Sequence, residues 1–329
     1  GAYISTRFFI KLPKLVPNSK TVTAALVLAI GVYWLVDILR QRAALRPAFA
    51  RWLKLGLLAV VISLLVVGPT WEAILLRRAT ESHRFVHDGL IQSEAAATFL
   101  SEGLNPYSVD YLETPMAQWP FQEGDLTEIP ALFHYPYMPL TFLLPWPIQS
   151  ISFSLWGWFD QQVSYLMLLA ASLAVSLGIA RKGWQQFALV STLGLNPLFV
   201  PFFIEGRNDI IALFWVVLAS LLASRRRHTL GGLALAAGCA SKQFAWFYVP
   251  FFFLYVGGAN ESARPWHHIR RPLVSFLLGF GLLIAPWLIW DAGGFVSSAV
   301  GFQSGIINKG YPISGCGFSS LLLGLGMIR

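Results

Sequence analysis

The sequence contains little charge and almost no cysteine. Only 12% of its 329 residues are charged, about half the share of a soluble domain, whereas 56% are hydrophobic and the mean hydropathy is +0.60. Its two cysteines, Cys239 and Cys316, are too few for a disulfide framework. The sequence has no Cys/His metal spacing, no glycine loop typical of nucleotide binding, no internal repeat and no soluble domain. We interpret Cys239, in a Gly/Ala-rich stretch, as a small packing residue.

Apolar runs dominate what remains. Each is roughly twenty residues long, enough to cross a hydrocarbon core about 30 Å thick, and their continuity excludes an alternating β-barrel pattern. We therefore expect an all-α, polytopic helical membrane protein with a single transmembrane domain over residues 1–329. A new apolar segment begins at Phe318, so we expect the chain to be part of a longer protein. The predicted spans are 21–39, 55–76, 163–180, 184–203, 210–223 and 273–290.

The formal charge of +8 does not indicate nucleic-acid binding. Basic residues cluster in short loops at 40–54, 225–228 and 264–271, which is the positive-inside pattern of cytoplasmic loops. Asp37, near the end of the first span, is expected to snorkel or to pair with Arg40. A basic N-terminus outside the membrane fits this topology less well.

Residues 77–135 form the longest polar segment and hold more than half of the 16 carboxylates. A loop of this length in an apolar chain is usually functional, and we place it on the extracytoplasmic side. Within it, apolar residues from Leu90 to Leu100 recur at three- and four-residue spacing, which predicts a short amphipathic helix ended by Gly103. Asp88 would then lie at or just before the helix N-terminus, where the dipole favours a carboxylate. It is either an N-cap or a catalytic base at the bilayer surface.

Two segments do not fit a simple span. Residues 140–158 are broken by Pro145 and Pro147 and rich in Trp, which predicts a kinked or re-entrant segment near an interface. If residues 77–135 are outside the membrane and residues 225–228 inside, the chain between them must cross the membrane an odd number of times. A re-entrant segment at 140–158 satisfies this condition. Residues 231–255 carry Lys242 at their midpoint. They form either two half-length helices with Lys242 at the tip or one long helix with a buried lysine.

Charged groups within or beside a bilayer are costly, so they are candidates for function. Each has a structural alternative. His134 is otherwise an interfacial residue beside aromatic side chains, the residues around Arg207 form a local turn with a salt bridge, and Lys242 snorkels. Asp110 and Glu113 are expected to be solvated. The candidates are Asp88, His134, Glu205, Arg207, Asp209, Lys242 and Lys309.

Several short motifs fall in order between residues 80 and 255. They are Asp88 before an Ala-rich helix, Gly103-Leu104-Asn105-Pro106-Tyr107, His134-Tyr135-Pro136-Tyr137-Met138-Pro139, Gly206-Arg207-Asn208-Asp209, and a Gly-rich segment from Leu230 to Lys242. Together they resemble the GT-C superfamily of membrane glycosyltransferases, and most of all glycosyltransferase family 87, whose members use polyprenol-phosphate-mannose. The sequence departs from the family pattern with Arg at 207 in place of Gln and with an additional span before Leu55.

The resemblance implies a GT-C-like bundle whose active site faces the extracytoplasmic side of the cell membrane. Asp88 would be the catalytic base that deprotonates an acceptor hydroxyl, and the sugar, a hexose such as mannose, would leave polyprenyl phosphate with inversion. Lys242 and Arg207 would neutralise the phosphate, and His134, Asp209 and Tyr107 would complete the substrate site. The expected partners are membrane lipid, a polyprenyl-phosphate sugar as donor, and a lipid or glycan acceptor. No metal and no cofactor beyond the donor is expected.

Two other classes compete with this interpretation. Broken helices and a midspan lysine also suit a transporter or lipid flippase, although a carrier needs no long acidic loop and the sequence lacks an inverted repeat. A non-catalytic scaffold would keep the fold without activity. Whether Asp88 faces a cavity that Lys242 or Arg207 also reaches distinguishes the scaffold from the enzyme.

Overall fold

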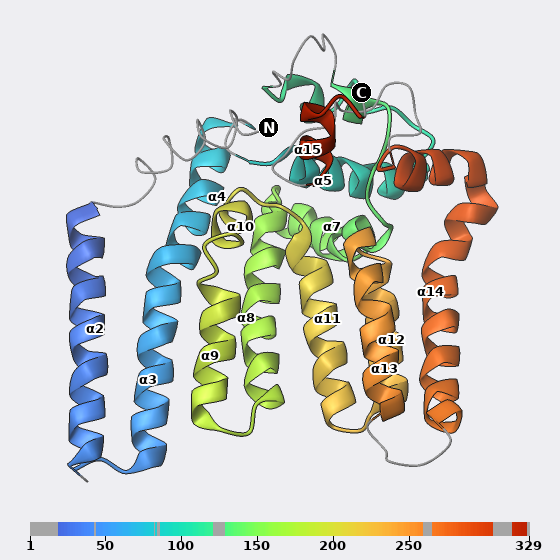
Figure 1. Ribbon diagram of the computed structural model, residues 1–329. Helices are drawn as coiled ribbons and strands as arrows, with labels where there is room; N and C mark the ends of the chain where they lie inside the picture. The colour runs from blue at the N-terminus through green and yellow to red at the C-terminus, as the bar shows by residue number, and fades with distance from the viewer. Residues whose placement is uncertain are drawn as a thin grey trace.

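The computed structural model describes residues 19–42, 44–81, 83, 86–120, 129–258, 265–304 and 318–327. Within these ranges the chain forms helices and no strand. Most of the helices stand side by side with their axes roughly aligned (Figure 1). Four stretches are long and apolar enough to cross a membrane, namely Thr23–Gln41, Pro47–Thr80, Gln161–Ile179 and Trp266–Gly301. The prediction of an all-α, polytopic membrane protein is confirmed.

The first two long helices form an antiparallel hairpin. Helix α2 (Ser19–Gln41) is followed by α3 (Pro47–Ile62), which continues through a π-helical turn, η2 (Ser63–Val67), into α4 (Gly68–Thr80). Helix α3 begins eight residues before the predicted span because Pro47 suits the first helical position, so Arg51 and Lys54 belong to the helix and not to a loop. The predicted partner of Asp37 was wrong: its Oδ1 lies 2.5 Å from Lys54 Nζ, because the hairpin places α3 alongside it.

The central bundle follows the predicted order. Its elements are α8 (Gln161–Ile179), α9 (Gly183–Gly194), α10 (Val200–Ile204), α11 (Asp209–Ser224), α12 (His228–Cys239), η6 (Gln243–Tyr248), α13 (Val249–Gly258) and α14 (Pro265–Val296). The π-helical turn η7 (Ser297–Gly301) follows α14, and the short helix α15 (Phe318–Gly324) lies apart from the upright helices (Figure 1). Of the two alternatives for residues 231–255, the structure has the pair of short helices. Helices α12 and α13 are joined by a 3₁₀ segment, and Lys242 immediately precedes it.

Residues 140–158 do not cross the bundle. Pro145 divides them into α6 (Leu140–Leu143) and α7 (Pro145–Trp156), and Figure 1 shows α7 lying across one end of the upright helices. Helices α8, α9 and α11 then run the length of the bundle, an odd number of passes as the loop charges require. The predicted proline break is therefore confirmed, although α7 lies over the end of the bundle instead of re-entering it.

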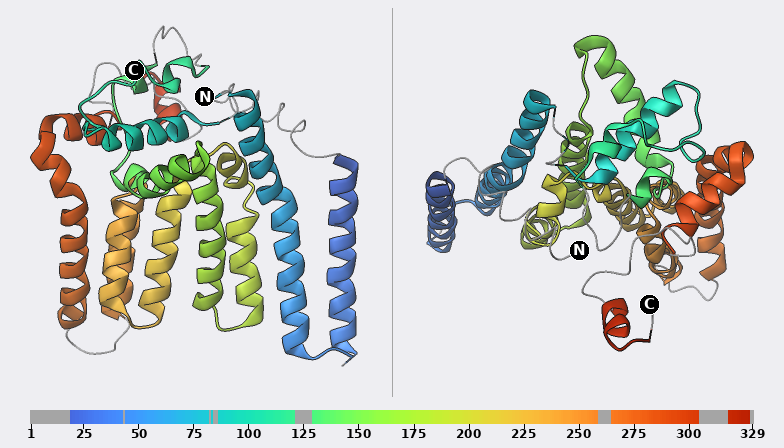
Figure 2. Two further views of the ribbon diagram at one scale, coloured as in Figure 1. Left: turned by 180° about the vertical axis from the view of Figure 1, so that it is seen from behind. Right: turned by 90° about the horizontal axis from the view of Figure 1, so that it is seen from above.

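Helix α5 (Asp88–Ser101) lies across the same end, as seen from behind and above in Figure 2. It contacts α6, α7 and α8 on one side and the short helix η4 (Pro115–Gln118) on the other; a further 3₁₀ turn, η5 (Pro130–Leu132), precedes the return to the bundle. The prediction of an amphipathic helix was wrong for its first turns, because elements on both sides bury every residue from Gly89 to Ala97 except Glu94. The helix ends at Ser101, before Gly103 with a φ of 77°.

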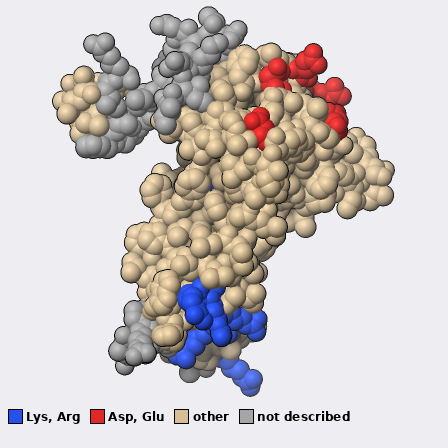
Figure 3. All heavy atoms as spheres, turned by 90° about the vertical axis from the view of Figure 1, so that its right-hand side faces the viewer, with Lys and Arg blue, Asp and Glu red and all other residues tan. Residues whose placement is uncertain are grey.

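Charge separates the two ends of the molecule. In Figure 3, Asp and Glu gather at the end that carries α5 and α7, while Lys and Arg gather at the opposite end. We call these the loop end and the basic end. The turns between α2 and α3, α8 and α9, and α11 and α12 all lie at the basic end (Figure 1). Asp110 and Glu113 are exposed at the loop end, as expected.

Candidate functional site

Asp88 is the first residue of α5. His87 precedes it in an extended conformation and caps the helix. Both His87 Nδ1, at 3.0 Å, and Asp88 Oδ1, at 2.6 Å, lie within reach of the Gly89 N–H, and His87 Nδ1 also lies 2.6 Å from Asp88 Oδ1. Nδ1 of His87 cannot be a donor and an acceptor at once. When Nδ1 carries a proton, it donates to Asp88 Oδ1, and the Gly89 N–H then donates to the same oxygen. Asp88 is thus part of the helix cap.

The surroundings of Asp88 favour its ionised form. Burial alone would raise the pKa of this carboxyl, but His87, the Gly89 N–H and the positive charge of Arg207 outweigh it and hold the pKa below its ordinary value. Both donors act on Oδ1, and Oδ2 accepts no hydrogen bond from any residue that the structure describes. The side chain remains 16% exposed. One oxygen of the ionised carboxylate is therefore left without a partner among the described residues.

The turn between α10 and α11 lies beside the start of α5. The His87 N–H donates to the Glu205 carbonyl over 2.7 Å. Gly206 has a φ of 83°, and a Cβ there would lie only 2.5 Å from Leu90 Cδ1, so glycine permits this close approach. Arg207 donates from Nε to Glu205 Oε2 over 3.1 Å and lies 3.9 Å from the Phe202 ring. The predicted salt bridge of the turn exists, and it orients Arg207 near Asp88.

Lys242 lies at the tip between α12 and η6. Its Nζ is 2.5 Å from Asp209 Oδ1 and 2.9 Å from Asn208 Oδ1, so the same turn that carries Arg207 also holds Lys242. The ammonium is 5.4 Å from the centre of the Tyr137 ring. These partners fix the Lys242 side chain beside the turn.

Tyr137 joins the two halves of this group. A Cβ built on Gly89 would lie 2.3 Å from the Tyr137 hydroxyl, so the ring presses against the first turn of α5. The ammonium of Lys242 also lies near this ring. A continuous set of contacts therefore runs from Asp88 through Gly89 and Tyr137 to Lys242, and a second runs through Glu205 to Arg207. We call Asp88, Arg207, Asp209 and Lys242 the loop-end charge cluster.

Tyr107 and His134 lie outside this cluster. Tyr107 is buried, its hydroxyl donates to the Tyr137 carbonyl over 2.9 Å, and burial raises its pKa well above the ordinary value. It packs edge-to-face on Phe142 and Trp287, which suits a residue that positions Tyr137. His134 contacts Phe302 and has Nδ1 3.4 Å from Ser298 Oγ. The structure gives neither a contact with Asp88.

Sequence reasoning missed a buried ion network beneath the cluster. Arg77, on α4, donates to Glu94 over 2.5 and 3.0 Å and to Asp160 over 3.1 Å. The Gln161 N–H also donates to Glu94, over 2.8 Å. The network ties α4, α5 and the start of α8 together, so it fixes the helix whose first residue is Asp88. The sequence does show these charged residues at the edges of three apolar segments. It does not show that they pair, because Arg77 and Asp160 lie 83 residues apart.

Some predictions concern residues outside the described ranges. Lys309, Cys316 and the carboxylates Glu123, Asp125 and Glu128 are among them. Cys239 is buried among small residues of α12, as its sequence context predicted. Within the described part of the chain, no group of His, Cys, Asp or Glu side chains has an arrangement that would hold a metal ion.

The described chain is a polytopic helical bundle of a membrane protein, and it brings carboxylates and paired cations together at one end. Residues 133–311 match the model of glycosyltransferase family 87, more than half of the chain, and the protein belongs to that family. The resemblance seen in the motifs is confirmed, and the protein is a membrane glycosyltransferase. The match includes Arg207, Asp209 and Lys242 but not Asp88. No curated protein and no solved structure matches the chain.

Proposed function

We propose that this glycosyltransferase moves a hexose such as mannose from a polyprenyl-phosphate donor to a hydroxyl of a lipid or glycan acceptor, with Asp88 as the general base. The observation that carries the proposal is the backbone hydrogen bond from His87, next to the partly exposed Asp88 carboxylate, to Glu205 of the turn that also holds Arg207 and Lys242. Acid–base and charge-stabilising groups thus occur together at the loop end. A scaffold without activity has no need of that combination.

The reaction requires one proton transfer. The acceptor oxygen attacks the anomeric carbon, its proton passes to Asp88 Oδ2, and the bond between that carbon and the phosphate oxygen breaks. Attack from the face opposite the phosphate inverts the anomeric centre. A base must lie within about 3 Å of the hydroxyl that it deprotonates, and Oδ2 accepts no other hydrogen bond from the described residues. The depressed pKa of Asp88 keeps this oxygen ready to accept a proton.

The phosphate needs neutralisation more than activation, because it is already a good leaving group. Lys242 and Arg207 carry positive charge into the cluster, and both are held by carboxylates of the same turn. Such preformed cations stabilise charge that develops on a leaving phosphate without first having to reorganise. Asp209 would orient Lys242 toward the donor. By the positive-inside rule, the basic turns at the other end of the molecule support an extracytoplasmic position for the loop end.

A transfer assay with matched variants tests the proposal. Purified protein in lipid is given radiolabelled polyprenyl-phosphate-mannose and a pool of lipid and glycan acceptors, and label in the acceptor fraction is measured. Asp88→Asn removes the base while keeping the size of the side chain, so transfer should fall by about 100- to 10,000-fold. Glu113→Gln makes the same chemical change at an exposed position of the same loop and should leave transfer unchanged.

The outcome separates the base from the enzyme class. Full transfer by Asp88→Asn would show that another group accepts the proton. If the parent protein transfers a different sugar from the donor, the assignment as a glycosyltransferase stands, but mannose is not its sugar. If labelled donor binds without any transfer, and binding is lost in Lys242→Ala, the phosphate part of the site stands and the acceptor has been chosen wrongly.

A further inference from the structure

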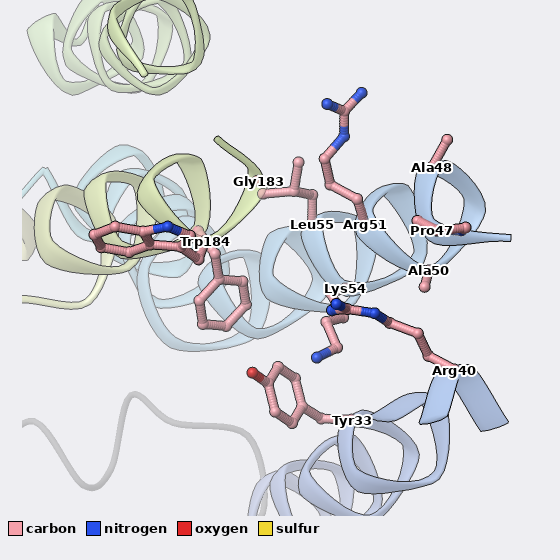
Figure 4. Close-up of a pocket in the computed structure, with 11 residues that line it drawn as sticks. Tyr33, Arg40, Pro47, Ala48, Ala50, Arg51, Lys54, Leu55, Gly183 and Trp184 are labelled. Atoms are coloured by element: carbon pink, nitrogen blue, oxygen red, sulfur yellow. The ribbon is translucent and has the colours of Figure 1, made fainter. Parts of the chain in front are cut away.

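A cavity of about 500 Å³ lies at the basic end, remote from Asp88 and the charge cluster. Figure 4 shows it between the end of α2, the first turns of α3 and the start of α9. Its cations are Arg40 from α2 and Arg51 and Lys54 from α3, and its aromatic walls include Tyr33 and Trp184. Nothing in the proposed transfer reaction uses this cavity.

The charge of the cavity is not balanced by the protein. Lys54 pairs with Asp37 over 2.5 Å, but Arg40 and Arg51 form no ion pair with any residue that the structure describes. Arg51 stacks against Trp52 at 4.9 Å, and its Nε is buried without a hydrogen-bond partner. A buried donor left unpaired is costly, so an acceptor from a ligand would stabilise the site.

The backbone adds to this positive potential. Helices α3 and α9 begin at Pro47 and Gly183, and both residues line the cavity. The first N–H groups of a helix have no intrahelical acceptor and carry partial positive charge, which favours an anion. Gly183 also leaves room for Arg51, because a Cβ there would lie 2.9 Å from Arg51 Cδ. Two helix starts and three cationic side chains therefore surround one space.

The position of the cavity selects the source of the anion. It lies where α2 ends and α3 begins, next to the exposed tryptophans Trp52 and Trp184, which suit the interface between headgroups and acyl chains. Tyr33 and Phe187, whose rings are 5.5 Å apart, supply an apolar wall. A phosphate that carries acyl chains would meet both the cations and this wall, whereas a soluble anion would use the cations alone. Basic pockets between membrane helices on the cytoplasmic side bind anionic headgroups.

We propose that this cavity binds the phosphate headgroup of an anionic glycerophospholipid from the leaflet at the basic end. Arg40 and Lys54, whose charged ends lie close together in Figure 4, contact the phosphate, and Arg51 adds its charge from another part of the cavity wall. The acyl chains follow the outer surface of α2 and α3. The bound lipid holds α2 against α9, two helices that otherwise meet through Tyr33 and Phe187. The site is separate from the active site, so lipid binding there does not depend on the proposed transfer reaction.

Native mass spectrometry of the purified full chain tests this proposal. The protein is mixed with equal amounts of dioleoylphosphatidylglycerol and dioleoylphosphatidylcholine, and retained lipid is counted. The parent protein should retain phosphatidylglycerol in preference. Arg40→Gln/Arg51→Gln should lower its apparent affinity about tenfold or more. Arg270→Gln/Arg271→Gln removes the same charge from exposed positions at the start of α14 and should change nothing.

A second variant separates binding from folding. Ala48→Glu places a carboxylate in the cavity near the start of α3, where acidic residues favour the helix, and it should also abolish the preference. Equal retention of phosphatidylglycerol by the pocket and control variants would overturn the proposal. So would equal retention of the two lipids by the parent protein. If inorganic phosphate at the same concentration displaces the lipid completely, the site recognises soluble phosphate and the lipid assignment is wrong.

Discussion

Lys242 Nζ lies 2.5 Å from Asp209 Oδ1, although 33 residues separate them in the sequence. Asp209 begins α11, and Lys242 ends the turn after α12, so the hairpin of these two helices closes at the loop end with an ion pair. Asn208 accepts a second hydrogen bond from the same ammonium over 2.9 Å. This arrangement holds one positive charge at a fixed point beside Tyr137 and the start of α5.

The first prediction concerns this ammonium. Lys242→Ala should raise the apparent KM for the polyprenyl-phosphate donor by about 10- to 100-fold, the value of one charge-assisted hydrogen bond. Steady-state transfer rates at varied donor and fixed acceptor concentration measure the effect. Lys182→Ala, exposed at the basic end, is the control. An unchanged donor dependence in Lys242→Ala would leave this residue with a purely structural role.

The sequence predicted what is local in this site. Apolar runs located the spans, Pro145 marked the break after α6, and the position of Lys242 in the middle of an apolar segment predicted two short helices as one alternative. The start of α5 at Asp88 and its end before Gly103 followed from helix signals alone. These features depend on neighbours in the chain, and a single sequence contains them.

Pairings across the bundle were beyond such reasoning. Asp37 pairs with Lys54 and not with Arg40, and Arg77 joins Glu94 and Asp160 from two other helices. Which charges meet depends on how helices pack, and a single sequence holds no record of that. The burial of α5 on both sides has the same origin, since a residue pattern cannot show that a second layer covers the helix.

A second prediction follows from the contact between Gly89 and Tyr137. Gly89→Ala would place a methyl group 2.3 Å from the Tyr137 hydroxyl and 3.2 Å from His87 Nδ1. The ring and the cap of α5 must shift, so kcat should fall about tenfold or more, as displacements of about 1 Å at a reacting centre do. The transfer assay measures this loss. Gly56→Ala, in α3 with no atom near its Cβ position, should retain full activity. Normal kcat in Gly89→Ala would show that the position of α5 does not limit catalysis.

A third prediction concerns the network around Arg77. Arg77→Met leaves the carboxylates of Glu94 and Asp160 together without their cation, and breaking a buried ion pair from one side costs about 3–5 kcal/mol. The melting temperature in detergent should therefore fall clearly. Arg78→Met, next in sequence but exposed and stacked on Trp158, should melt close to the parent protein. Equal melting of the two variants would show that the network adds nothing to stability.

A fourth prediction uses the titration of Asp160. Burial, together with the charge of Glu94, raises the pKa of this carboxyl to about 6 despite the opposing effect of Arg77. A carboxyl with a raised pKa in the folded state stabilises the fold while protonated, below its unfolded pKa of about 3.9, and this contribution is lost as the pH rises through about 6. Between about pH 5 and pH 7, the melting temperature of the parent protein should therefore fall relative to that of Asp160→Asn, which cannot titrate at this position. A difference that is constant over this range would contradict the assignment.

The last prediction concerns His87 and the pH dependence of transfer. The pKa of Asp88 is depressed, because His87, the Gly89 N–H and Arg207 outweigh burial. Its ionic contacts therefore stabilise the fold above the unfolded pKa of about 3.9 and are lost as the pH falls through the lower folded value. The base is ionised over the whole working range, so kcat/KM of the parent protein should show no acid limb from Asp88 between about pH 5 and 8.

His87→Ala removes the largest of the effects that lower the pKa of Asp88, so that burial, which raises this pKa, is opposed less. The pKa of Asp88 should then rise, and an acid limb should enter the measured range, with the rate recovering at higher pH where the carboxylate is ionised again. His228→Gln, at the basic end, serves as the control and should keep the parent profile. A change of kcat at every pH without a new limb would mean that His87 only positions α5. An unchanged profile with unchanged rate would mean that the 2.6 Å contact between His87 and Asp88 has no part in the reaction.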